Sequence, residues 1–294
     1  MTQSVGTLYL GDYSYSSWSL RGWLLVMRFG LSASVKIVDF SAGASVAEQM
    51  QVLPPARTVP ALALPDGGVL TDSIAIAEEL ATRHPAAGHW PSDPVARAGA
   101  RSLTAEMHSG FGALRSACPM NLRVSHAGFA MTEGVRADLD RIEALWSWAR
   151  GQFGAQGPWL FGTYSAADAF YAPVAARIAG YDLPVGAVAQ DYVSAHLSDP
   201  AFRRWRAMGL ARGEDLARYA KDLPRRPWPG PAPRPARAVE SGPSVNDACP
   251  YSGKPVSHFL EMGGAVYGFC NAFCRDKTVA DPEAWPAFMA LVAR

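Results

Sequence analysis

A segment that holds seven prolines divides this chain into a long front part and a short tail. The prolines fall between Asp222 and Pro243. Because proline has no amide hydrogen and a fixed φ, this stretch cannot form a helix or a central strand. At ~3.1 Å per residue, an extended polyproline spacer of this length would span roughly 60 Å. We expect a linker over residues 222–244; the alternative is a peptide ligand for an SH3-like partner.

The composition is typical of a globular protein with more than one domain. The 294 residues fit about two domains of ~150 residues each. Hydrophobic residues make up 49% and charged residues 18%, so packed cores can form. The net charge of +1 does not favour nucleic acid or a membrane surface as a partner. We find neither a signal-peptide pattern nor a run of ~18 apolar residues. We expect a cytoplasmic protein whose four cysteines are thiols or metal ligands.

Residues 7–84 alternate between strand-like and helix-like patterns. A helical stretch that ends at Gly30 separates two strand-like runs, 7–10 and 35–40. This order predicts a β-α-β unit with parallel strands. A further pair of strands flanks P-D-G-G, which is a hairpin signal, and Asp72 then precedes a helix as its N-cap. The front of the chain is therefore expected to fold as β-α-β followed by β-β-α.

Only helical patterns follow until the proline-rich segment. The expected helices cover residues 93–118, 133–153, 166–180 and 187–212. Ser165 and Asp168 have the spacing of a capping box at the start of the third of these helices. We interpret this pair as structural.

Two serines, Ser16 and Ser17, stand at the start of the first helix. Ligands of open α/β sheets bind at the carboxyl edge of the strands, where this helix begins. Unpaired amides and the helix dipole favour an anion there, and a serine hydroxyl can donate to a thiolate. Lowering a thiol pKa by ~2 units needs about 2.7 kcal/mol, which one charge-assisted hydrogen bond and a dipole end can supply. Taken alone, two serines before a helix usually serve only as an N-cap.

Several motifs make residues 5–215 resemble a cytosolic glutathione transferase. They are S-S-W-S-L-R (16–21), R-T-V-P-A-L (57–62), T-D-S-I-A-I (71–76) and the S-A-A-D box (165–168). The first is similar to the S-S-C-S-W-R of the zeta class, with Trp18 in place of the cysteine. It is closer to bacterial transferases that read Y-S-S-W-S-L-R and later E-M-H-S-G-F. The resemblance implies an α/β thioredoxin-like domain over 1–85, an all-helical domain over 90–221, glutathione as co-substrate and a homodimer.

The resemblance also implies which hydroxyl faces the glutathione sulfur. Ser16 matches the serine in that position, and Ser17 is the next candidate. Tyr13 or Tyr15 would serve if a tyrosine donates instead.

The same comparison of motifs implies the rest of the glutathione site. Val59, before a Pro60 that we expect to be cis, matches the residue whose backbone pairs with the cysteine of glutathione. Asp72 and Ser73 match the pair that holds the γ-glutamyl end. Thr58 lies beside this groove.

A pocket for the second substrate is expected at the first helix of the helical domain. Met107, Phe111 and Leu114 share one face of that helix. They would form an apolar pocket for a small electrophile, with His108 or Arg115 as its polar group. The alternative is that the apolar side chains pack in a core.

Cys249, Cys270 and Cys274 give the tail three soft sulfur ligands. A hairpin at Gly263 and Gly264 would bring the first cysteine toward the other two. A module of ~50 residues is too small to be held by its core alone, and a metal ion is a common staple. Thiolates suit Zn²⁺ or Cu⁺ better than Mg²⁺. The alternative is that the thiols are merely buried.

Residues 245–294 also resemble the treble-clef metal modules of the YHS/TRASH group. The shared strings are C-P-Y-S-G-K-P-V, Y-G-F-C-N-A-F-C-R-D-K and A-D-P-E-A-W. The resemblance implies a small treble-clef-like α+β module. Such modules often begin C-x-x-C, whereas this chain has Ser252, a poor metal ligand, in the second position. The fourth ligand would be His258, a water molecule or none.

Three functions remain open at this point. The first is a glutathione transferase that conjugates or isomerises a small apolar electrophile or reduces a peroxide. The second is a non-catalytic scaffold that binds metal or a partner through its tail. The third, a disulfide reductase, is disfavoured because the first helix carries Ser16 and no C-x-x-C.

Overall fold

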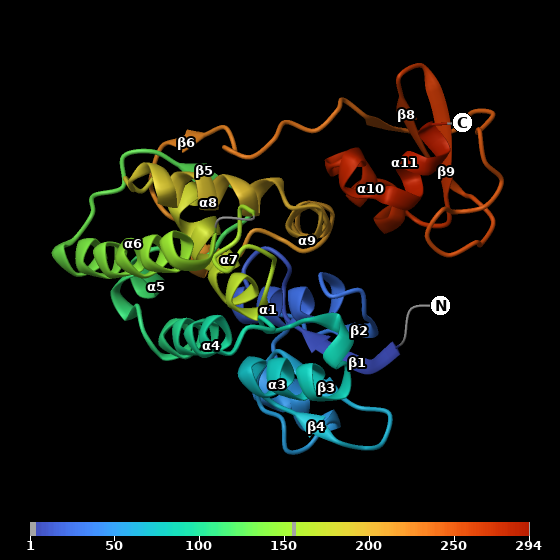
Figure 1. Cartoon of the computed structure of the whole chain (residues 1–294). Coiled ribbons are helices and arrows are strands. Elements are labelled where there is room, and N and C mark those ends of the chain that lie inside the picture. The colour runs from blue at the N-terminus through green and yellow to red at the C-terminus, as the bar shows by residue number, and fades with distance from the viewer. Residues whose placement is uncertain (1–3, 155–156, 294) are drawn as a thin grey trace. The chain divides into compact units, whose positions relative to one another are not determined.

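A computed structural model describes residues 4–154 and 157–293, which form two compact units (Figure 1). The first unit holds the described residues up to Leu197 together with Glu214–Pro229. The second holds Ser198–Gly213 and the described residues from Gly230 onward. The ranges expected for the domains also include residues 1–3, 155–156 and 294, which lie outside the described residues.

The first unit contains a mixed sheet with the strand order β2-β1-β3-β4. Its strands are β1 (Ser4–Leu10), β2 (Ser32–Ile37), β3 (Ala61–Ala63) and β4 (Val69–Leu70). Strands β1 and β2 are parallel, and the other neighbours are antiparallel. The helices of this part are α1 (Ser17–Met27), α2 (Val46–Gln49) and α3 (Ser73–Arg83), with 3₁₀ turns at Met50–Val52 and Pro85–Ala87.

The expected β-α-β and β-β-α order is confirmed, and with it the thioredoxin-like arrangement of the front of the chain. The second strand begins at Ser32 rather than at the expected residue 35. It starts earlier because β2 pairs with β1 from Ser4 onward.

Close packing sets the position of the first helix. Gly22 lets α1 approach the chain at Pro60, since a Cβ on Gly22 would lie 2.7 Å from the Pro60 Cβ. Ser16 is the N-cap of α1, and its Oγ accepts a hydrogen bond from the Ser19 amide at 3.3 Å. The start of α1 therefore lies beside the segment that carries Pro60.

The helical part of the first unit follows the sheet (Figure 1). Its elements are α4 (Pro94–Ser109), α5 (Gly112–Ala117), α6 (Glu133–Phe153), α7 (Ala166–Gly180), α8 (Ala187–Ser198) and a 3₁₀ turn at Ala217–Tyr219, with the short antiparallel pair β5 (Ser125–His126) and β6 (Arg225–Arg226). Helix α7 is buried along its whole length and packs against α1 and α4. The expected helices over 133–153 and 166–180 are confirmed.

Two expected helices are interrupted. The helix over 93–118 is instead α4 and α5, because Phe111 takes a left-handed backbone conformation with φ 57°. The helix over 187–212 ends at Ser198, and α9 (Pro200–Ala211) begins after it. Asp199 caps this new helix, and Pro200 occupies its first turn, where proline is well tolerated.

Asp168 holds the start of α7. Its carboxylate accepts hydrogen bonds from the Ser165 amide at 2.8 Å, the Ser165 hydroxyl at 3.0 Å, the Leu160 amide at 3.1 Å and the Tyr192 hydroxyl at 2.8 Å. The structural interpretation of this pair is therefore confirmed.

The second unit is a small α+β structure that also includes α9. Its elements are β7 (Arg237–Val239), β8 (His258–Met262), β9 (Ala265–Phe269), α10 (Ala272–Ala280), a 3₁₀ turn at Pro282–Ala284 and α11 (Pro286–Val292). The expected hairpin joins β8 and β9, and Gly263 and Gly264 both take positive φ, as a tight two-residue turn requires. Leu260, Phe269 and Phe288 are fully buried and form the centre of its core.

Within residues 222–243, the described strands are β6 and β7, both short and at sheet edges. None of the helices in the part of the chain that the structure describes is long and apolar enough to cross a bilayer.

Candidate active site

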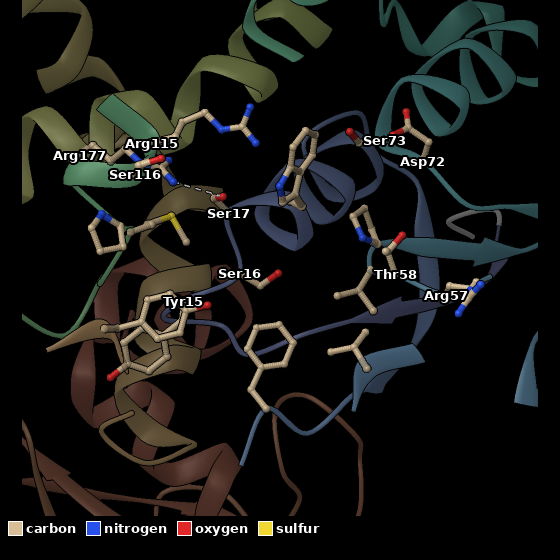
Figure 2. A pocket seen from close by; sticks show the side chains of 18 of the residues that line it. Tyr15, Ser16, Ser17, Arg57, Thr58, Asp72, Ser73, Arg115, Ser116 and Arg177 are labelled. Carbon is tan, nitrogen blue, oxygen red and sulfur yellow. Dashed lines mark hydrogen bonds between the residues drawn. The ribbon is translucent and has the colours of Figure 1, made fainter. Parts of the chain in front are cut away.

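A cleft of about 740 Å³ opens beside the start of α1 in the first unit (Figure 2). Its walls come from the loop before α1, the segment before β3, the start of α3, and α5 and α7. The structure brings most of the residues expected to bind glutathione together here, namely Ser16, Ser17, Thr58, Val59, Pro60, Asp72 and Ser73.

The hydroxyl of Ser16 points into this cleft (Figure 2). Ser16 is only 6% exposed, so few water molecules compete for its hydroxyl. Its Oγ donates to the Ser19 Oγ at 2.8 Å, and the Ser19 Oγ in turn accepts from the Gly11 amide at 2.8 Å. If the two hydroxyl groups rotate so that Ser19 donates to the Ser16 Oγ, the Ser16 proton is free to bind an anion in the cleft.

The neighbouring hydroxyls have other partners. The Ser17 Oγ accepts a hydrogen bond from Arg177 at 3.5 Å. The Tyr15 hydroxyl accepts from the Leu216 amide at 3.3 Å, and burial raises its pKa. Tyr13 is buried and does not line the cleft. Because an accepted hydrogen bond leaves the hydroxyl proton available, these contacts do not exclude Ser17 or Tyr15 as donors; Ser16 is distinguished by its hydroxyl, which points into the cleft (Figure 2).

The segment before β3 presents main-chain groups to the cleft. The peptide bond between Val59 and Pro60 is cis, as expected. The amide and carbonyl of Val59 have no hydrogen-bond partner among the described residues. Thr58 is exposed at the edge of the cleft next to Arg57. An extended peptide can pair with this free backbone as an added strand.

The start of α3 forms another wall. Asp72 is the N-cap of α3, and its Oδ1 accepts from the Ile74 amide at 2.7 Å. Ser73 is 1% exposed, and its Oγ has no hydrogen-bond partner among the described residues. A buried hydroxyl without a partner, beside the positive end of a helix, favours a bound carboxylate.

Two residues expected to line a second-substrate pocket do not line the observed cleft. Met107 and Phe111 are buried in the core, at 0% and 6% exposure. The break after α4 explains this correction, because Phe111 caps α5 and does not continue the face of Met107. Leu114 is likewise fully buried, so core packing, the alternative interpretation, holds for these apolar side chains.

The polar residues of the expected pocket differ in position. His108 does not line the cleft; its ring meets Trp18 edge-on, and its Nε2 lies 3.5 Å from the Asp72 Oδ2. Burial lowers the pKa of His108. Arg115 does line the cleft, as expected.

Sequence reasoning missed several residues of the cleft. Arg177, Tyr219 and Met120 line it, although they lie far from the front motifs in the sequence. No local pattern marks them, because each is brought to the cleft by the packing of the helical part against α1. Cys118 is fully buried, and burial raises its pKa to about 11.

The second unit contains a separate cluster of thiols. The sulfur atoms of Cys249, Cys270 and Cys274 all lie within 4.8 Å of one another, as the predicted hairpin required. The Ser252 Oγ lies 3.2 Å from the Cys270 Sγ. His258, the fourth ligand considered above, is not part of this group; its Nδ1 lies 3.0 Å from the Ser257 Oγ.

The thiol pKa values of Cys249 and Cys274 are shifted in opposite directions. Burial raises the pKa of Cys249, but hydrogen bonds from the Cys270 and Tyr251 amides and from the Ser252 side chain outweigh it. The net effect lowers its pKa to about 7. Burial raises the pKa of Cys274 to about 12.

Comparisons with known proteins agree with this architecture. Residues 15–83 match the family model described as the glutathione S-transferase N-terminal domain. A glutathione transferase homolog from Burkholderia GL BGR1, solved with bound glutathione, is 25% identical, with 69% of this chain and 96% of that chain covered and a TM-score of 0.51. A glutathione transferase from Methylococcus capsulatus str. Bath is 24% identical, with 68% and 96% covered and a TM-score of 0.50.

A more distant match shows the same fold. Glutathione transferase Omega 1C from Trametes versicolor is 21% identical, with 68% of this chain and 89% of that chain covered and a TM-score of 0.53. A comparison with curated protein sequences found no significant match. The front of this chain therefore has the thioredoxin-like fold of glutathione S-transferase N-terminal domains, and with the helical region that follows it has the glutathione transferase fold.

Proposed function

We propose that this chain is a glutathione transferase that holds glutathione in the cleft of the first unit and uses its thiolate as a nucleophile. The observation that carries the proposal is the Ser16 hydroxyl, which points into a cleft whose other walls offer free peptide groups at Val59 and an unpartnered hydroxyl at Ser73. The Ser16 hydroxyl matches the thiol of glutathione, the peptide groups of Val59 match its backbone, and the Ser73 hydroxyl matches its γ-glutamyl carboxylate.

Two parts of the tripeptide, the cysteinyl backbone and the γ-glutamyl end, have distinct partners in this proposal. The cysteinyl backbone pairs with the amide and carbonyl of Val59. The γ-glutamyl carboxylate accepts from the Ser73 hydroxyl at the positive end of α3. The γ-glutamyl ammonium lies toward the Asp72 carboxylate, which is half-buried at the same helix start. Thr58 lies at the edge of the groove.

Ser16 then faces the glutathione sulfur. Its hydroxyl donates to the thiolate while Ser19 donates to Ser16, and the start of α1 adds its dipole. Ser16 is a hydrogen-bond donor in this mechanism, not a nucleophile. The thiolate attacks the electrophile, which rests near α5 and α7. Conjugation, isomerisation and peroxide reduction all use this thiolate, and we expect the chain to act as a homodimer.

Two matched variants test the proposal. We expect Ser16→Ala to lower kcat/KM for an aromatic electrophile by about 10²–10³, the usual cost of removing an anion-stabilising donor. Ser17→Ala is the control, because the Ser17 hydroxyl lies against Arg177, 3.5 Å from its guanidinium, and this variant should lose less than about 10-fold. The wild-type chain should also be retained on immobilised glutathione. A wild-type chain that neither binds glutathione nor turns over electrophiles would leave only the scaffold function.

We propose in addition that Cys249, Cys270 and Cys274 hold a zinc-type ion in the second unit. Thiolates at ~2.3 Å from a tetrahedral zinc lie roughly 3.8 Å apart, and the Cys270 and Cys274 sulfurs are 4.0 Å apart. The donor set therefore fits such an ion. The ion would supply folding stability to a small core, with a water molecule or no ligand in the fourth position.

Elemental analysis of the intact chain tests this second proposal. We expect about one zinc per purified chain, lost in Cys249→Ser and in Cys274→Ser because each removes one of few ligands. Cys118→Ser is the matched control, since Cys118 lies in the first unit. The same metal content in all four proteins, including none, would contradict a site at these cysteines.

A further inference from the structure

One wall of the cleft carries two guanidinium groups that form no ion pair with any described residue. Arg115 reaches it from α5 and Arg177 from α7. Among the described residues that line the cleft, Asp72 is the carboxylate, and it lies on the opposite side at the start of α3 (Figure 2). The two sides of the cleft therefore differ in charge.

Arg177 is a buried cation held by neutral groups. It is 5% exposed and donates to the carbonyls of Cys118 at 2.9 Å and Pro173 at 3.1 Å, and to the Ser17 hydroxyl at 3.5 Å. No carboxylate within the described residues forms an ion pair with it. Burial, and then the charge of Arg115, lower its pKa to about 10.

Arg115 is the more accessible of the pair. Its Nη1 donates to the carbonyls of His108 and Gly110, both at the long distance of 3.4 Å, and its guanidinium lies 4.9 Å from the centre of the Trp18 ring. It makes no ion pair with any described residue. Its remaining N–H groups are free to meet a ligand in the cleft.

A third guanidinium lies behind this wall. Arg21 is 1% exposed, and its group is 4.4 Å from the Trp18 ring and 5.0 Å from the Phe170 ring. Its Nε and Nη1 have no hydrogen-bond partner among the described residues. Burial and then the charges of Arg177 and Arg115 lower its pKa to about 9, and the Asp72 carboxylate offsets only part of this effect. Three cations that repel one another would all be stabilised by one anion.

We propose, on the basis of the transferase function above, that the electrophile carries an oxyanion such as a carboxylate, which binds between Arg115 and Arg177. The planar guanidinium groups suit bidentate contact with such an anion. The anion cannot be the γ-glutamyl carboxylate of glutathione, because Ser73 and α3 hold that group on the other wall. This proposal departs from the sequence-based expectation of a small apolar electrophile.

Matched electrophiles test this charge preference in the full-length protein. The pair is a chlorodinitrobenzoate and the corresponding chlorodinitrobenzamide, which share ring and leaving group. In each, the glutathione sulfur bonds to the ring carbon, chloride leaves with the bonding electrons, and the thiol proton passes to solvent. After division by the uncatalysed rates, we expect kcat/KM to favour the benzoate by about 10-fold or more, the size of one charge-assisted hydrogen bond.

Variants of Arg115 show whether that preference has the proposed origin. Arg115→Met should bring the benzoate-to-benzamide ratio near unity, whereas Arg115→Lys should keep most of it. Arg101→Met, on α4 and outside the cleft, is the control that keeps the wild-type ratio. A wild-type ratio near unity, or an unchanged ratio in Arg115→Met, would overturn the inference while leaving the transferase function intact.

A binding measurement tests the inference if the protein turns over neither compound. The two glutathione conjugates are then titrated into the wild-type chain by calorimetry. A preference for the benzoate conjugate, lost in Arg115→Met, supports the inference without catalysis. Equal affinities overturn it. No binding of either conjugate overturns both the inference and the glutathione site on which it rests.

Discussion

Hydroxyl groups of similar chemistry have different roles at the start of α1 because their neighbours differ. Ser16 has its hydroxyl in the cleft, Ser17 is engaged by Arg177, and Tyr15 stacks on Tyr219. The two serines are adjacent in the sequence, so local pattern could not separate them. What separates them is Arg177, which comes from α7 and is placed by tertiary packing.

At the same scale, His196 should make the first unit sensitive to acid. It is fully buried, and burial lowers its pKa from 6.5 to about 3. Below pH 6.5 the unfolded chain binds a proton that the folded chain does not, so the free energy of unfolding falls with falling pH. The loss is about 1.4 kcal/mol per pH unit. We expect His196→Gln to remove this slope relative to wild type between pH 6 and pH 4.

Denaturant titrations at several pH values, followed by tryptophan fluorescence, measure that slope. The same substitution at His84, which is half-buried, is the matched control. If the free energy of unfolding depends on pH in the same way in wild type and in His196→Gln, the buried imidazole is not the cause of the acid sensitivity.

At the scale of elements, the order of strands and helices followed from the sequence, whereas several ends did not. The P-D-G-G turn, the Asp72 cap and the glycine pair of the tail hairpin were all readable, because each acts through local backbone geometry. The break at Phe111 was not readable, since a left-handed phenylalanine carries no sequence signal. The break before α9 does have a sequence signal, Asp199-Pro200, but the helical pattern on both sides of it predicts one continuous helix.

The start of α7 offers a test at this scale. Asp168 accepts hydrogen bonds from two amides and two hydroxyls. Asp168→Asn should lower the free energy of unfolding by ~2–4 kcal/mol, because an amide NH₂ would face buried donors. Ser165→Ala, which removes one hydroxyl from the set, should cost only ~1 kcal/mol. A loss below ~0.5 kcal/mol for Asp168→Asn, measured by denaturant titration, would contradict this account.

At the scale of the whole molecule, the chain joins two units with separate chemistry: a cleft suited to glutathione and a cluster of thiols. The front motifs predicted that Ser16, Val59 and Ser73 would lie in one site, because each residue is at a recognisable turn or helix start, and all three line the cleft. They could not predict the cationic wall. Arg177 contributes to that wall from 160 residues beyond Ser17, and no periodicity records such a contact.

The most direct test of the central claim is the pKa of the glutathione thiol when bound, measured from thiolate absorbance as a function of pH. The account predicts a value ~2 units below the ordinary ~8.5 in the wild-type protein. It also predicts a value near the ordinary one in Ser16→Ala and a nearly wild-type value in Ser17→Ala. A bound thiol whose pKa is the same in wild type and in Ser16→Ala would contradict the account.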